Sequence, residues 1–164
     1  MNLYMPGFNE TDFAIYNPDG QLRVQRSLVT IQNARRNART PVEMEHVLRL
    51  SEEALRLNLA EKAVAEAKFT QARGRAAHHL REAAGKFERS TLWGAQRVER
   101  QLKLEHALAQ FGAKHFAEAQ AEAERIVADL IGLNVIVPVT AKPKPMQAEQ
   151  RNSAPAISRV QRSA

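Results

Sequence analysis

The sequence predicts a mainly α-helical protein built on a long antiparallel helical hairpin or coiled coil. Residues 40–132 begin with a strong helix start at Thr40, contain no proline after Pro41, and carry 19 alanines over residues 41–131. Alanine has the highest intrinsic helix propensity, whereas proline breaks helices. We therefore assign residues 40–132 to a helical body.

The helix start is specified by the stretch "TPVEMEHV" at residues 40–47. Thr40 suits the N-cap, and Pro41 suits the first helical position, where its missing N–H costs nothing. Glu43, three residues after the cap, can return a hydrogen bond and complete a capping box.

The apolar residues of the body recur every three or four positions, as they do along one face of a helix. In the first half this stripe consists of Met44, Leu48, Leu55, Leu59, Ala63, Phe69, Ala72, Ala76, Leu80, Ala83 and Phe87. In the second half it consists of Val98, Leu102, Leu108, Gly112, Phe116, Ala119, Ala123, Ile126 and Leu130. Each stripe is a seam that needs a partner helix.

Two arrangements of the body compete. The chain can fold back near "ERSTLWGAQ" (88–96), with Ser90 or Thr91 capping a second helix that ends at Gly132 in a left-handed position. Alternatively, residues 41–131 form one continuous helix, roughly 135 Å long. We favour the hairpin because it buries its own seam. Gly112 is a candidate for a further bend.

Residues 1–39 are interpreted as an aromatic leader, a small β-hairpin and a basic arm. The hairpin lies in "DFAIYNPDGQLRV" (12–24), where "NPDG" suits a turn between segments of alternating apolar residues. Residues 25–39 fit either a helical face or an extended arm. Residues 133–139, which include the β-branched "NVIVPV", are predicted as a short strand, and residues 140–164 as an extended basic tail. If the body folds back, the hairpin and this strand could form a small sheet beside Thr40.

The leader contains four of the nine aromatic residues of the chain: Tyr4, Phe8, Phe13 and Tyr16. A disordered leader would be poor in aromatic residues. These rings should therefore be buried, either in the fold of this chain or against a partner, and we take them as candidate docking residues.

The net charge of +6 is concentrated in two flanking segments, because residues 41–131 hold 14 basic and 14 acidic residues. The candidate basic contact residues are Arg35, Arg36, Arg39, Lys142, Lys144, Arg159 and Arg162. Such arms bind phosphate through charge, with little sequence preference. They could equally contact an acidic protein surface.

The residue pattern indicates no enzyme, cofactor or metal site. The chain has no Cys, and its five His residues form no ligand pattern beyond His78 with Glu82 at helical i, i+4 spacing. No apolar run is long enough for a membrane span, and the first ten residues do not resemble a signal peptide. We expect a virion or cytoplasmic protein that is not secreted by a signal peptide.

These features favour a non-enzymatic structural or adaptor subunit of a large assembly, in contact with other protein subunits and forming a homo-oligomer. The composition is small, Ala/Arg/Gln-rich, helical and Cys-free with extended ends. It is similar to that of internal, ejection or tail-associated virion proteins of bacteriophages, which implies a virion component. The alternative is an accessory protein that binds nucleic acid through its basic arms.

Overall fold

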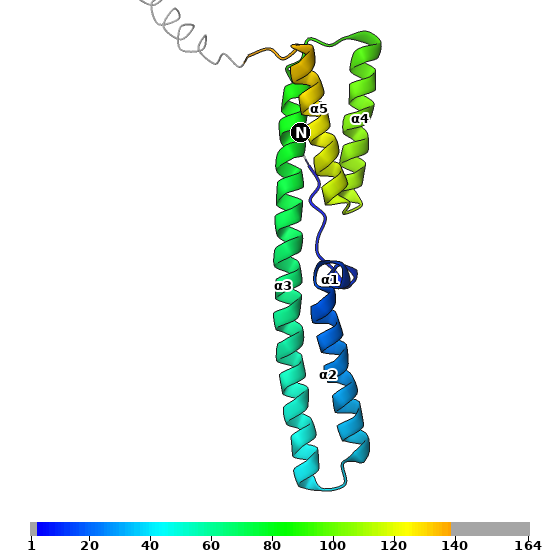
Figure 1. Ribbon diagram of the computed structural model, residues 1–164, viewed down its shortest axis with the longest axis vertical. Helices are drawn as coiled ribbons and strands as arrows, with labels where there is room; N and C mark the ends of the chain where they lie inside the picture. The colour runs from blue at the N-terminus through cyan, green and yellow to red at the C-terminus, as the bar shows by residue number, and fades with distance from the viewer. Residues whose placement is uncertain (1–2, 139–164) are drawn as a thin grey trace, which may run out of the picture.

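The computed structural model describes residues 3–138 and is mainly α-helical (Figure 1). Its helices are α1 (Glu10–Tyr16), α2 (Pro18–Asn37), α3 (Pro41–Glu88), α4 (Gly94–Gly112) and α5 (Phe116–Leu133). α3 contains 48 residues, so it extends roughly 72 Å. The predicted helical class is therefore confirmed, and α3 forms the long axis on which the other helices pack.

Residues 89–93 interrupt the body, so the single continuous helix is wrong. The Ser90 hydroxyl donates to the carbonyl oxygen of Phe87 at 2.6 Å, which satisfies a carbonyl at the end of α3. Ser90 thus closes α3. The prediction that Ser90 or Thr91 caps the second helix is wrong. The N-cap of α4 is Trp93, which makes no side-chain capping bond, and Gly94 follows with a φ of +62°. A positive φ is readily adopted by glycine.

A second reversal at residues 113–115 divides the remaining chain into α4 and α5. Lys114 takes a φ of 68° at this turn, directly after Gly112 and Ala113. α4 runs antiparallel to α3, and α5 runs parallel to it, so the three helices lie side by side (Figure 1). The predicted pair of long helices is therefore replaced by three helices, which we call the body: residues 61–88 of α3, α4 and α5.

The predicted β-hairpin at residues 12–24 is wrong, because this segment folds into α1 and α2. Asn17 is the N-cap of α2, its side chain accepts from the N–H of Gly20, and Pro18 occupies the first turn. Asparagine, proline and aspartate suit an N-cap and first helical turn as well as they suit a β-turn. The predicted basic arm at 25–39 is likewise helical through Asn37, so its extended alternative is wrong.

The region after α5 contains no strand among the described residues, which end at Pro138. Asn134, with a φ of 53°, provides the left-handed end of α5, whereas Gly132 remains helical. The predicted strand is reduced to one antiparallel bridge between Ser90 and Ile136. Because α5 returns to the α3–α4 turn, this segment lies far from Thr40, and the predicted sheet at Thr40 is wrong (Figure 1).

The helix start at Thr40 is confirmed, since both hydrogen bonds of the capping box with Glu43 are present. α2 and residues 41–60 of α3 form an antiparallel pair that extends away from the body, and we call this pair the stalk (Figure 1). Its small interior contains Ile31, Val47 and Ala54. The main core lies in the body and includes Phe69, Leu80, Phe111 and Leu130, each less than 2% exposed.

Candidate interaction surfaces

The leader aromatics divide into buried and exposed members. Phe13 is 3% exposed, whereas Tyr4 is 75% exposed. The rings of Phe8 and Tyr16 both pack edge-on against Phe69, with centroid distances of 5.5 Å. Burial raises the pKa of the Tyr16 hydroxyl, and the nearby Asp12 raises it further. Phe8, Phe13 and Tyr16 therefore pack within the fold of this chain. Docking of the leader onto a partner stays a prediction, and Tyr4 is the exposed ring available for it.

The leader is fixed to the body by polar contacts as well as by aromatic rings. The Asp12 side chain is 3% exposed, and its Oδ2 lies 2.6 Å from Lys114 Nζ at the α4–α5 turn. The same oxygen accepts from the backbone N–H of Asn9 at 2.9 Å. Arg73 donates to the carbonyl oxygen of Pro6 at 2.9 Å. These bonds join α1 to the α4–α5 turn and the leader to α3.

A second polar cluster joins α2 to α3 at the upper end of the stalk. The Asn17 amide donates to Glu61 Oε2 at 2.7 Å and to the Glu61 carbonyl oxygen at 3.0 Å. Arg23 pairs with the same carboxylate at 3.1 Å. Hydrogen bonds from Arg23 and then from Asn17 lower the pKa of Glu61. A Cβ at Gly20 would collide with the Asn17 and Glu61 side chains, so this close approach requires glycine.

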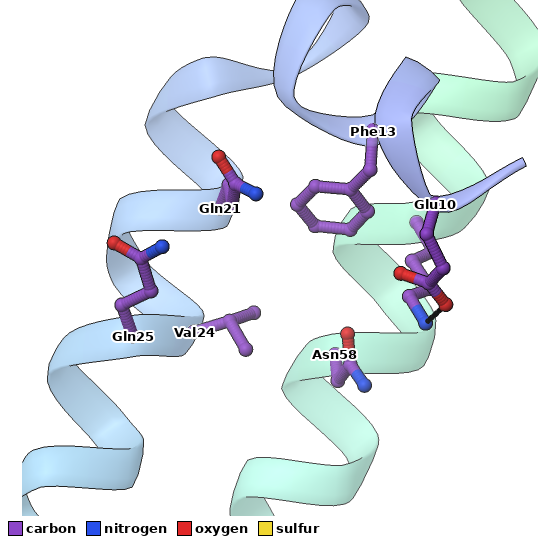
Figure 2. A pocket seen from close by; sticks show the side chains of 7 residues that line it. Glu10, Phe13, Gln21, Val24, Gln25 and Asn58 are labelled. Atoms are coloured by element: carbon purple, nitrogen blue, oxygen red, sulfur yellow. Dashed lines mark hydrogen bonds and ion pairs between the residues drawn. The ribbon is translucent and has the colours of Figure 1, made fainter.

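A polar recess lies between α1, α2 and α3 (Figure 2). Phe13 and Val24 form its apolar part, while Glu10, Gln21, Gln25, Asn58 and Lys62 contribute polar groups. The Glu10 carboxylate pairs with the Lys62 ammonium at one side of the recess. The recess shares Val24 and Asn58 with a groove that lies further along the stalk, between α2 and α3.

The basic candidates within the described chain gather at the free end of the stalk. Arg35 and Arg36 lie in the last turn of α2, and Arg39 lies in the loop before α3. All three are exposed. Arg39 Nη1 also donates to the carbonyl oxygens of Arg36 and Ala38, at 3.0 and 3.1 Å, and so caps the end of α2. The other basic candidates, Lys142, Lys144, Arg159 and Arg162, lie outside the described residues.

One side of the stalk exposes an apolar face, which we define by Leu28 of α2 and Met44, Leu48, Leu55 and Leu59 of α3. Leu48, Leu55 and Leu59 are 60–63% exposed, and Met44 and Leu28 are 45% and 49% exposed. Leu28 and Leu55 line a groove with a volume of about 290 Å³, together with Val24, Ile31, Ser51 and Ala54. The four α3 residues belong to the predicted seam, and among residues 3–138 no helix covers them.

A second set of exposed apolar side chains lies at the N-cap and in the first half of α4, and we call it the α4 ridge: Trp93, Val98 and Leu102. Trp93 is 84% exposed, and Val98 and Leu102 are each 59% exposed. Val98 and Leu102 line an open recess of about 480 Å³ with Gly94, Arg97, Gln101 and Glu105. Val98 and Leu102 belong to the predicted seam, whereas the sequence placed Trp93 only within the segment 88–96 where the chain was predicted to fold back. Its exposure depends on the α3–α4 turn.

The described residues contain no group of three or more His, Asp, Glu or Cys that could hold a metal ion. His79 lies 3.4 Å from Glu124, and His106 lies 2.9 Å from Glu122, each as an isolated pair between neighbouring helices. Among residues 3–138, no helix is both long and apolar enough to cross a membrane. The sequence matches no family model, no curated protein and no solved structure. The surfaces themselves therefore carry the functional argument.

Proposed function

We propose that this protein is a non-enzymatic structural or adaptor subunit of a large macromolecular assembly. The observation that carries this proposal is the exposure of apolar side chains on two separate parts of one elongated chain. The stalk exposes its leucine face, and the α4 ridge exposes Trp93 near the opposite end of α3. Large exposed apolar patches mark interaction sites, and tryptophan is enriched at energetically dominant interface positions.

The assembly that we propose is a bacteriophage virion, in which the chain serves as an internal, ejection or tail-associated protein. The support is the similarity in composition described above, together with the arrangement of the exposed surfaces. A rod with one surface on the stalk and another on the body can join two neighbours at a fixed separation. That property suits a subunit whose role is to connect other proteins.

The α4 ridge provides the test of this proposal. In extracts of the source organism or its phage, the tagged chain should sediment with particles far heavier than itself. Trp93→Ser with Leu102→Ser should shift it to the light fractions, because loss of one central interface tryptophan typically weakens binding by about thirtyfold or more. Velocity sedimentation with mass spectrometry of the heavy fraction measures this shift.

A matched control for the ridge is Val29→Ser, which changes another exposed aliphatic residue, 54% exposed, on α2. This variant should remain in the heavy fractions. Sedimentation of the unmodified chain as a free small protein, in extracts whose other particles remain intact, would contradict the assigned role.

A second candidate function is nucleic-acid binding, favoured by the grouping of Arg35, Arg36 and Arg39 at the stalk end. Arg35→Ala, Arg36→Ala and Arg39→Ala together should reduce the slope of log affinity against log salt by about 3 on duplex DNA, because each phosphate contact contributes about 0.9. Fluorescence anisotropy over a salt series measures the slope. A triple variant at Arg56, Arg75 and Arg81, all exposed on α3, removes equal charge elsewhere and should leave it unchanged. Absence of binding at low salt would eliminate this candidate.

A further inference from the structure

We propose that the apolar face of the stalk binds the same face of a second copy of this chain. The two α2–α3 pairs would then form a four-helix bundle around a two-fold axis that runs along the stalk. This inference rests on the proposed function and names the first partner of the subunit. It also assigns the stalk to self-association, which leaves the α4 ridge for other proteins.

The register of α3 shows that this exposed face continues the same line of residues that is buried in the body. Leu48 and Leu55 are seven residues apart, and continuing in steps of seven leads through Lys62 to Phe69, Ala76 and Ala83. The last three are fully buried, at 0% exposure, beneath the helices of the body. A sevenfold repeat keeps these positions on one side of a packed helix. The seam is therefore covered in the body and open in the stalk.

The two stalk helices carry opposite charge, and this favours a second copy as the occupant. Residues 20–37 of α2 contain four arginines and no acidic residue. Residues 41–59 of α3 contain four glutamates and two arginines. Of these charges, Glu52 and Glu45 lie seven and fourteen residues before Leu59 and so border the apolar face, and Arg35 lies seven residues after Leu28. Opposite charges bordering the face on the two helices complement a rotated copy, as a two-fold interface requires.

The charges also select the direction of the axis. A two-fold axis along the stalk places α2 of each copy against α3 of the other, so opposite charges face one another. An axis across the stalk would instead place α2 against α2, so two helices of net positive charge would face one another. We therefore infer the arrangement in which the two stalks point the same way, with antiparallel neighbours within the bundle.

The size of the face fits this role. α2 has 20 residues, so the face is about 30 Å long and two helix diameters, about 20 Å, wide. Taken as a flat rectangle, the face has an area of roughly 600 Å², and the uneven surface of the side chains adds to the accessible area. This area approaches the ~800 Å² that each partner buries in a standard interface. The exposed leucines would provide its apolar centre.

Self-association is tested by the molar mass of the full chain, measured by light scattering from micromolar to hundreds of micromolar concentration. We expect a dimer. Leu48→Glu with Leu55→Glu should weaken it by about hundredfold or more, since two carboxylates would be buried without partners. Both side chains are more than half exposed in the single chain, so helicity measured by circular dichroism should be retained. The matched control is Val42→Glu, which changes a 71% exposed residue on another face of α3.

The direction of the axis is tested by cross-linking, which is simple because the chain has no Cys. In the inferred arrangement, equal residue numbers lie at equal heights. Met44→Cys and Leu59→Cys, about 22 Å apart along α3, should therefore each link to themselves through a flexible bismaleimide. Glu53→Cys, on the opposite face of α3, should not form this link.

A monomer at all concentrations, or a dimer that survives both glutamates, would overturn the inference. Linking at only one of Met44 and Leu59 would overturn the inferred axis. A monomeric chain that still enters heavy particles through the α4 ridge would overturn the stalk dimer alone and leave the proposed function standing.

Discussion

Replacing Phe69 by alanine should lower the free energy of unfolding by about 3–5 kcal/mol, which is the usual cost of removing a fully buried phenylalanine. Phe69 is 0% exposed and contacts the rings of Phe8, Tyr16 and Phe116 at centroid distances of 5.2–5.5 Å. Lys114 Nζ also lies 5.6 Å from its centroid. The substitution therefore leaves a cavity where the leader, α1, α3 and α5 meet.

Urea unfolding followed by circular dichroism at one protein concentration measures this loss. The matched control is Tyr4→Ala, which removes an aromatic ring of the same leader that is 75% exposed. Surface changes of this kind usually alter stability by less than about 0.5 kcal/mol. A loss below about 1 kcal/mol for Phe69→Ala would show that the leader does not pack on α3 as described.

Replacing Asp12 by asparagine should cost about 2–4 kcal/mol. Removing one partner of a buried ion pair costs about 3–5 kcal/mol, and the 24% exposure of the Lys114 side chain reduces this, because water can solvate the remaining ammonium. The Asn9 N–H also loses its bond to a charged acceptor. The effect should be large because this pair joins α1 to a turn 102 residues further along the chain.

A double-mutant cycle with Lys114→Met measures the interaction energy between Asp12 and Lys114 separately from their other contacts. The double variant should be more stable than the sum of the two single losses predicts, since neither charge is then left alone. Glu99→Gln provides the control, because Glu99 and Lys103 form a pair that is more than half exposed on both sides, and such pairs are worth less than about 1 kcal/mol. Equal losses for Asp12 and Glu99 would contradict the buried pair.

Sequence reasoning recovered the helical class, the start of α3 and the buried sides of α5 and of α3 within the body. The seam residues Phe69, Ala76 and Leu80 in α3 and Phe116 and Ile126 in α5 are all buried. These predictions succeeded because capping chemistry and helical periodicity are local signals. The predicted seam of α4 was wrong, because Val98 and Leu102 are exposed and Leu104, Ala107 and Phe111 are buried instead.

The N-terminal hairpin failed because the same four residues support two local structures. Asn17, Pro18, Asp19 and Gly20 fit a β-turn, yet they also form the start of α2. The choice depends on Glu61, which lies 44 residues from Asn17 and bonds to it. A contact of this range is invisible to a local pattern, and tertiary context overrides it.

The surfaces were only partly foreseeable. The seam showed that Leu48 and Leu55 need a partner, but not that α2 covers only one side of them. Trp93 lies in the segment 88–96 where the chain was predicted to fold back, but its exposure follows from the geometry of residues 89–93. The additional turn at Lys114 sends α5 back toward Ser90 and thereby leaves the stalk with two helices instead of three.

Small-angle X-ray scattering on an absolute scale tests most directly whether the stalk is an interface between parallel copies of the chain. The reference is the Leu48→Glu, Leu55→Glu variant, which carries the same termini. The unmodified chain should show twice the mass of this variant at nearly the same maximum dimension, because the copies lie side by side. Equal masses for the two proteins, or a doubled mass with a much greater maximum dimension, would contradict the account.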